Sequence, residues 1–417
     1  MLPGLWGRTM RTTELSMDTD TGTSRLGLYL AFLQLAFTLL WTTYVIFLPK
    51  LAAGVGIAPS AVIFVLMMDQ AIFTITDTAM GIAADRIARS VGRLGPLIGV
   101  LTAVSCAAFV ALPFVTGPDA KVIFVGLIVI WAITSSALRA PPLILLGQHA
   151  AKPRVPFLAA LVMLGYGLAG AVSPYLGALL RDHDARMPFI ISTLVLVITA
   201  FGLSQVGPAL GQRDATGARV QAKPVPLRGW PMMFIGAMLV FALGSQLHLS
   251  INSEAFYLRF AKAADLPWLM PVFWIGFNIA MFPASVIVKH RGALIVIGIA
   301  GLLGGIAIVA AEIAGALNVL IVAQFIAGAA WGCMMMGAIS AALWIGATGA
   351  EGKVTGLVFS ALALATVARM AAVAGGLQKL PDFAPLVHWA PVACWLVAGT
   401  GLLVIAAARL QGKRVQV

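Results

Sequence analysis

Five ionisable residues lie inside long apolar stretches of this sequence, namely Asp69, Asp77, Arg139, Glu254 and Arg369. A charge among apolar side chains is costly unless it pairs with an opposite charge, faces a cavity or exchanges a proton. These acids and arginines could therefore form ion pairs that make and break, contact a polar solute, or take up and release protons.

No residue pattern typical of an enzyme or a metal centre accompanies these charges. The polar segments contain no Ser/His/Asp arrangement, no phosphate-binding loop and no cluster of metal ligands. Cys106, Cys333 and Cys394 lie in apolar runs without CxxC spacing and are expected to be small core residues. We therefore expect no catalytic residue, no metal and no cofactor.

The elements that position these charges must sit in lipid. Of the 417 residues, 61% are hydrophobic and only 10% are charged, and the mean hydropathy is +1.00. Apolar runs of about 20 residues select transmembrane helices rather than a β-barrel. The formal net charge of +12 is scattered over short loops, which argues against nucleic-acid binding because that needs a clustered basic face.

The apolar runs predict an all-α integral membrane protein with twelve transmembrane helices. The predicted spans lie near 26–48, 58–84, 95–116, 122–147, 155–180, 187–207, 231–255, 266–288, 292–314, 317–347, 353–376 and 385–408. The longest polar interruption divides them into six and six. The expected parts are a tail at 1–25, a six-helix bundle at 26–207, a linker at 208–230, a second six-helix bundle at 231–408 and a tail at 409–417.

Charge asymmetry predicts the orientation. The tails and the loops on their side hold most of the 27 lysines and arginines, and cytoplasmic segments carry this excess. We therefore expect both termini in the cytoplasm and the chain in the inner membrane.

A motif follows the second predicted span. Gly81, Asp85, Arg86 and Arg89 resemble the signature G-x-x-x-D-R-x-G-R of the major facilitator superfamily, with Ala88 in place of the second glycine. The resemblance implies two pseudo-symmetric six-helix bundles around a central cavity that opens alternately to either side. It also implies a gate, in which the glycine permits close helix approach and the aspartate accepts from a facing helix N-terminus or an arginine.

The second span is also similar to the glycoside-pentoside-hexuronide cation symporters within that superfamily. The similarity rests on Asp77, Gly81 and Asp85-Arg86, followed by Gly92-Arg93 and Pro96. It implies that Asp77 helps to bind a coupling cation. The family's second acidic position falls here on Phe73, which leaves coupling to a proton or to no ion open.

The fifth span offers a competing pattern. Ala160, Ala169, Ser173-Pro174 and Gly177-Ala178 follow the spacing of the antiporter motif G-x8-G-x3-G-P-x2-G-G, with small residues in place of most glycines. Such residues are also typical of closely packed membrane helices.

The intramembrane charges suggest two pairs. Asp77 lies roughly 12 Å above Asp85 along its helix, so Asp77 could pair with Arg139, which precedes Pro141-Pro142. On the outer side, Asp69 or Glu254 could pair with Arg369 in a gate that breaks when that side opens.

Further polar and aromatic residues are expected to line the central cavity. They are Trp41, Tyr44, Gln246, His248, Asn252, Asn278 and Trp331.

The function predicted from these features is secondary active transport of a small organic solute, coupled to protons and operating as a monomer in contact with lipid. The alternatives are a drug-type proton antiporter, and a non-transporting scaffold or sensor with the same fold. The substrate, the coupling ion and the direction of transport do not follow from the sequence.

Overall fold

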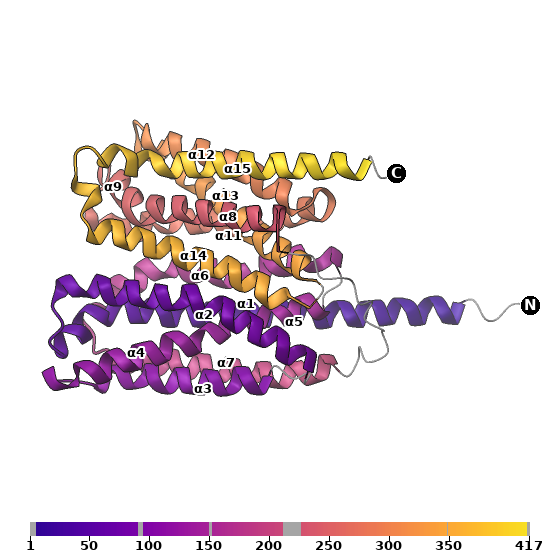
Figure 1. Ribbon diagram of the computed structural model, residues 1–417, viewed down its shortest axis with the longest axis horizontal. Coiled ribbons are helices and arrows are strands. Elements are labelled where there is room, and N and C mark those ends of the chain that lie inside the picture. Colours follow the sequence, from indigo (N-terminus) through magenta and orange to yellow (C-terminus); the bar gives the residue numbers. More distant parts are fainter. Residues whose placement is uncertain (1–5, 91–94, 150–151, 212–226, 348, 415–417) are drawn as a thin grey trace, which may run out of the picture.

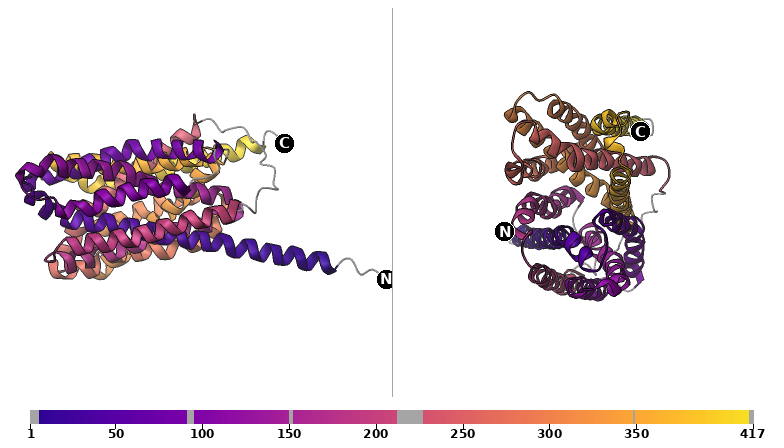
Figure 2. Two further views of the ribbon diagram at one scale, coloured as in Figure 1. Left: turned by 90° about the horizontal axis from the view of Figure 1, so that it is seen from below. Right: turned by 90° about the vertical axis from the view of Figure 1, so that its left-hand side faces the viewer.

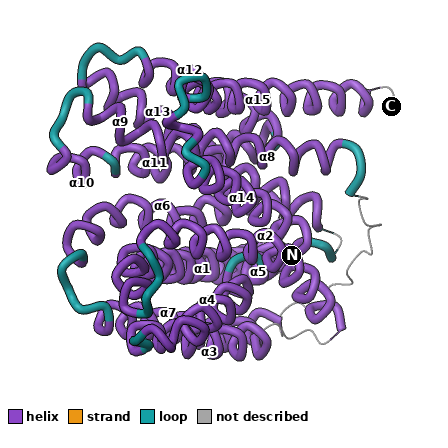
Figure 3. Tube along the Cα trace, turned by 60° about the vertical axis from the view of Figure 1, so that its left-hand side comes forward, coloured by secondary structure: helices purple, strands orange, loops and turns teal. Residues whose placement is uncertain are grey.

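The computed structural model describes residues 6–90, 95–149, 152–211, 227–347 and 349–414, and these residues are helical with short connections and no strand (Figure 3). The long helices are α1 (Trp6–Gly54), α2 (Val62–Ser90), α3 (Gly95–Ala111), α4 (Lys121–Ser135), α5 (Pro141–His149), α6 (Val155–Leu180), α7 (Arg186–Gly211), α8 (Trp230–Leu247), α11 (Pro271–Arg291), α12 (Ala293–Glu312), α13 (Leu317–Gly346), α14 (Glu351–Ala374) and α15 (Ala384–Arg414). Two short helices, α9 (Ser253–Leu258) and α10 (Leu266–Leu269), connect α8 to α11.

The spans are helical because lipid offers no partner for backbone N–H and C=O groups, which must therefore bond within each span. They are long because each must cross a hydrocarbon core about 30 Å thick. Within the described residues, ten helical segments are long and apolar enough to cross a membrane. Two shorter apolar helices, Gly99–Phe114 and Arg186–Phe201, cover the predicted third and sixth spans. The all-helical membrane fold is thus confirmed, while the count of twelve stays a prediction.

Two predicted spans are interrupted. The fourth consists of α4, a 3₁₀ turn at Ser136–Leu138 and α5, so the helix breaks at Arg139 and resumes at Pro141-Pro142. Proline is accepted at the start of a helix because its missing N–H would have no intrahelical partner there. The seventh contains a π-helical segment, His248–Asn252, between α8 and α9, which was not predicted from the sequence.

The helices form two groups. In Figures 1 and 2, most of the helices from α1 to α7 lie in one group and α8 to α15 lie in the other. Both chain ends project from the same end of the bundle, which we call the terminal end; the opposite one is the distal end (Figure 1). Helix α1 begins at Trp6 and so extends through much of the predicted polar tail, whereas the predicted linker lies mostly outside the described residues.

Close helix crossings depend on glycine. A Cβ atom placed on Gly328 of α13 would lie 2.6 Å from the carbonyl carbon of Phe273 in α11, which is closer than real Cβ contacts. Gly276 of α11 likewise faces the backbone of Phe325 in α13. Because lipid supplies little hydrophobic drive between helices, such close backbone packing is a main source of association.

We expect Gly328→Ala to destabilise the protein because the added methyl group must separate α11 from α13. Overpacking of this kind costs roughly 1–3 kcal/mol, which should lower the melting temperature of the detergent-solubilised protein by a few degrees. The matched control is Gly401→Ala, because a Cβ atom on Gly401 would have no neighbouring atom within 4 Å; this change should leave the melting temperature unchanged or raise it. Equal melting temperatures for the two variants would contradict the packing explanation.

Candidate functional site

Helices α2 and α14 meet at the terminal end through Asp85. This buried carboxylate accepts hydrogen bonds from the backbone N–H groups of Gly352 and Lys353, each at 2.8 Å. Helix α14 begins at Glu351, and the first N–H groups of a helix have no intrahelical partners and carry partial positive charge. A negative side chain on α2 therefore stabilises the start of α14.

Glycine lets the two backbones approach around this contact. A Cβ atom on Gly81 would overlap the carbonyl group of Gly352, and one on Gly356 would lie 2.5 Å from the carbonyl oxygen of Asp77. One turn further along α14, the Ser360 hydroxyl group is 2.7 Å from that of Thr78. We call this set of contacts between α2 and α14, including Asp85, the latch.

The motif continues beyond the latch. Arg86 is the next residue of α2, and its side chain is exposed. The side chain of Arg89, and residues Gly92 and Arg93 of the cation-symporter resemblance, lie outside the described part of the structure.

A buried ion pair lies next to the latch. Arg139 Nη1 is 2.9 Å from Asp77 Oδ2, and Asp77 is completely buried. The pairing proposed from spacing alone is therefore present. The break between α4 and α5 positions Arg139, and a hydrogen bond of 2.6 Å between the Thr76 and Ser136 hydroxyl groups joins α2 to the 3₁₀ turn.

Aromatic rings enclose the arginine of this pair. The Cζ atom of Arg139 lies 4.8 Å from the ring centroid of Phe73 on α2 and 5.2 Å from that of Phe359 on α14. Phe73 occupies the position where the cation symporters carry a second acid, and here its ring contacts the guanidinium group instead. Phe359 belongs to the other helix group, so the ion pair is close to the boundary between the groups.

Asp69 lies deeper along α2. It is completely buried, and its Oδ2 accepts a 2.7 Å hydrogen bond from the Tyr44 hydroxyl group. Within the described residues its Oδ1 has no hydrogen-bond partner. Asp69 is thus a buried acid held by a neutral hydroxyl group.

Trp41 and Tyr44 pack in an aromatic cluster. Trp41 stacks on Trp131 with centroids 5.5 Å apart, and the Tyr44 ring centroid is 4.6 Å from that of Trp131. Phe73 and Phe109 extend the cluster. The structure places Tyr44 in the protein core, where it holds Asp69, while Trp41 is only partly buried.

The predicted outer pair is not formed in this structure. Within the described residues, Arg369 makes no ion pair and its buried Nε atom has no hydrogen-bond partner. Asp69 bonds to Tyr44, and Glu254 is exposed in the first turn of α9. The gate between Arg369 and an acid stays a prediction for a state in which the distal end is closed.

A second buried polar network surrounds the π-helical segment of the seventh span. The ring nitrogen Nε2 of His248 is 2.9 Å from Gln324 Oε1, and Gln324 Nε2 donates to Ser253 at 3.1 Å. Asn252 donates to the backbone carbonyl groups of Val387 and His388 at the start of α15. Gln324 was not among the candidates predicted from sequence, although an amide inside the apolar run 317–346 was the available signal.

The remaining cavity candidates occupy varied positions. Asn278 donates to the carbonyl group of Trp274 in its own helix at 2.8 Å. Trp331 is buried and stacks on Trp395, with centroids 6.0 Å apart. Gln246 is partly buried.

Small residues of α6 serve helix packing. A Cβ atom on Gly165 would meet the backbone of Ala31 and Leu35 in α1, and one on Gly170 would overlap the indole ring of Trp274 in α11. Ser173 and Thr42 of α1 share a hydrogen bond of 2.9 Å. Of the residues in the fifth-span pattern, Ser173 makes a contact between helices, whereas a Cβ atom on Gly177 would have no neighbouring atom within 4 Å. Both explanations of the pattern therefore stay predictions.

The described residues contain no group of three or more His, Cys, Asp or Glu side chains that could hold a metal ion. The site described above consists of one ion pair together with hydroxyl groups and amides at the helix contacts.

The family profile described as the Major Facilitator Superfamily matches residues 30–370, which contain the latch and the buried ion pair. This chain belongs to the Major Facilitator Superfamily. Members of this superfamily are transporters, and the chain is accordingly a multi-pass membrane protein with a transporter fold.

Solved structures agree on the fold. The human organic anion transporter MFSD10 (TETRAN) has a TM-score of 0.71 and 15% sequence identity, with 91% of this chain and 99% of that chain covered. The Escherichia coli fucose:proton symporter FucP has a TM-score of 0.68 and 13% identity, covering 91% and 98%. A bacterial homologue of the iron transporter ferroportin, solved in an outward-facing state, has a TM-score of 0.69 and 13% identity, covering 92% and 99%.

At these identities the likeness concerns the fold alone. A comparison with curated proteins finds no match.

We expect Asp85→Ala to open the latch of this superfamily member, because α14 loses two hydrogen bonds to a charged acceptor, each worth roughly 1.5–3 kcal/mol. Thr78→Cys and Ser360→Cys, introduced together after replacement of the native cysteines, report on closure through disulfide formation. The rate of cross-linking should fall by at least about fivefold in the Asp85→Ala background. Asp119→Ala, at an exposed acid near the distal end, should leave the rate unchanged; an equal rate in both backgrounds would contradict the role of Asp85.

We also expect Asp77→Asn to destabilise the protein by about 3 kcal/mol or more, because it leaves the Arg139 charge buried without its partner. The double variant Asp77→Asn/Arg139→Gln removes both charges and should recover much of that loss. Thermal or chemical unfolding of the four proteins in a double-mutant cycle measures the coupling. Additive effects of the two substitutions would mean that the pair is not energetically coupled.

Proposed function

We propose that this protein is a secondary active transporter that carries a small organic solute across the inner membrane by alternating access, coupled to protons. The observation that carries the proposal is the buried Asp77–Arg139 ion pair, 2.9 Å long, next to the latch. A pair of this kind is costly in lipid, and intramembrane ionisable residues mark substrate and ion pathways. Its contact with Phe359 extends its surroundings to the second helix group.

The arrangement fits an outward-facing state. Asp85 and the glycine contacts hold α2 against α14 at the terminal end, while Arg369 makes no ion pair within the described residues. In Figure 1, α14 slopes from the lower helix group at the terminal end toward the upper group at the distal end. We infer that closure of the distal end brings Arg369 to an acid and releases the latch.

Asp69 is the proposed site of proton exchange. It is buried, its partner is the hydroxyl group of Tyr44, and its Oδ1 has no other partner in the described part of the chain. A proton that binds to Asp69 neutralises its charge. If the outward-facing state and the state with a closed distal end differ in their affinity for this proton, its binding shifts the equilibrium between them. The fucose symporter among the structural neighbours is named as a proton symporter, which supports coupling to protons here.

The proposal includes twelve spans with both termini in the cytoplasm. Helix α7 has 26 residues, and α3 with its following 3₁₀ turn reaches from Gly95 to Phe114, so both are long enough to cross the hydrocarbon core. Both chain ends then lie on one side, as the excess of basic residues there requires. In this proposal the two helix groups are the bundles expected at 26–207 and 231–408, and one chain supplies the whole transport path.

Ligand-dependent stabilisation tests the function. Purified protein is heated with sugars, organic acids, amino acids, nucleosides or amphipathic drugs, at two pH values and with or without sodium. A solute at 100 times its dissociation constant adds about 2.7 kcal/mol to the stability. If solute and proton bind together, stabilisation increases as the pH falls; Asp69→Asn mimics the neutral acid and should keep the binding but lose its pH dependence.

Asp182→Asn is the matched control, because Asp182 is exposed in the loop between α6 and α7. It should retain the pH dependence of the wild-type protein. If stabilisation by the solute depends on pH in the same way in Asp69→Asn as in the wild-type protein, Asp69 has no role in proton coupling. Solute uptake into proteoliposomes that is indifferent to a pH gradient would overturn proton coupling itself.

A further inference from the structure

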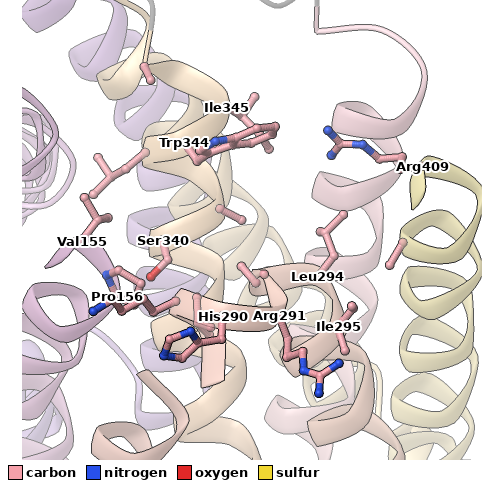
Figure 4. Close-up of a pocket in the computed structure, with 18 of the residues that line it drawn as sticks. Val155, Pro156, His290, Arg291, Leu294, Ile295, Ser340, Trp344, Ile345 and Arg409 are labelled. Carbon is pink, nitrogen blue, oxygen red and sulfur yellow. The ribbon is translucent and has the colours of Figure 1, made fainter. Parts of the chain in front are cut away.

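A cavity of about 690 Å³ lies at the terminal end. Its walls come from the starts of α6, α8 and α12 and from the ends of α5, α11, α13 and α15 (Figure 4). None of the residues discussed above as cavity or coupling candidates lines it. It is therefore separate from the Asp77–Arg139 pair and from the His248 network.

Four basic side chains share this cavity. Lys289, His290 and Arg291 form the last turn of α11, and Arg409 comes from α15. No aspartate or glutamate is among the lining residues, and within the described residues none of the four has a carboxylate partner. Such a concentration of positive charge attracts anions.

Two tryptophan rings hold Arg409 at the cavity. Its Cζ atom lies 3.8 Å from the ring centroid of Trp230 and 5.1 Å from that of Trp344. In Figure 4, Arg409 and Trp344 lie on one side of the cavity, while His290 and Arg291 lie on the other. The two basic groups thus approach the space between them from different helices.

Apolar side chains surround the charges and continue onto the outer surface. Leu294, Leu343 and Leu410 line the cavity, and Leu410 is 56% exposed. Val286 and Ile287, one turn before the basic residues, are 57% and 52% exposed. Exposed apolar residues next to basic and tryptophan side chains are typical of the level where lipid headgroups meet acyl chains.

We propose that this cavity binds the headgroup of an anionic phospholipid from the leaflet at the terminal end. Charge complementarity selects an anion, and the adjoining exposed apolar surface fits its acyl chains. Basic pockets between membrane helices on the cytoplasmic side are suited to such headgroups. The inference uses the membrane orientation proposed above.

A bound lipid would join the two helix groups. Val155 and Pro156 belong to the start of α6, whereas the basic residues belong to α11 and α15. The first group uses Asp85 to hold the start of α14, but the last turn of α11 carries only basic charge. The lipid phosphate supplies a negative charge at that turn, so we expect it to favour the closed terminal end.

Native mass spectrometry of the full chain tests the site with three probes: phosphatidylglycerol, phosphatidylcholine and inorganic phosphate. The wild-type protein should retain phosphatidylglycerol in preference to phosphatidylcholine. Each basic side chain near the surface adds about 1 kcal/mol, so the double variant Arg291→Gln/Arg409→Gln should bind phosphatidylglycerol about 30-fold more weakly. The control Arg181→Gln/Lys379→Gln removes the same charge from exposed positions near the distal end and should bind like the wild type.

Two further measurements keep the test decisive. The single variant Arg291→Gln, at an exposed side chain, should weaken binding about fivefold and replaces the double variant if that protein does not fold. A photoactivatable phosphatidylglycerol on the wild-type protein should label the ends of α11 and α15. Labelling elsewhere, equal loss in the control, or no preference over phosphatidylcholine would overturn the site.

Competition separates the two sources of phosphate. If inorganic phosphate at millimolar concentration displaces phosphatidylglycerol and stabilises the protein equally, the site takes a soluble anion and the lipid proposal is wrong. These measurements contain no transported solute. Failure of the lipid site is therefore distinguishable from failure of the proposed transport function.

Discussion

The contact between Asp85 and the start of α14 is the interaction on which the observed arrangement depends. A carboxylate from α2 accepts from two backbone N–H groups that α14 cannot satisfy within itself. Charge and geometry act together there, because the acceptor is ionised and the helix end carries partial positive charge. The contact requires glycine at Gly81, since any Cβ atom would overlap Gly352. The contact between α2 and α14 thus depends on the residue types at positions 81 and 85.

The buried Asp77–Arg139 ion pair is connected to this contact through Asp77. Asp77 presents its side chain to Arg139 and its backbone carbonyl to Gly356 of α14. A movement of α14 away from α2 would therefore change the packing around both the charge pair and Phe359. Because desolvated charges are sensitive to small changes in their surroundings, the pair can respond to the same motion that opens the latch.

The sequence predicted the features that follow from local rules. Apolar runs located the helices, and the spacing between Asp77 and Asp85, with the prolines after Arg139, was sufficient to predict the ion pair. Tyr44 as the partner of Asp69, and Gln324 as the partner of His248, could not be predicted because these contacts join helices distant in sequence. The π-helical segment at His248–Asn252 has no proline or glycine to announce it. Packing against neighbouring helices determines these hydrogen-bond partners and the π-helical segment, and the spacing of apolar residues along the sequence does not predict them.

The two halves achieve closure at the terminal end by different means. In the first half, Asp85 near the end of α2 meets the start of α14 directly. In the second half, the last turn of α11 carries Lys289, His290 and Arg291 and borders a cavity. Basic residues suit the C-terminal turn of α11 through its dipole, but the side chains of Lys289 and Arg291 have no acceptor for the N–H groups at the start of another helix. The proposed closure is therefore asymmetric, because the first half completes it within the chain and the second half relies on the proposed anion.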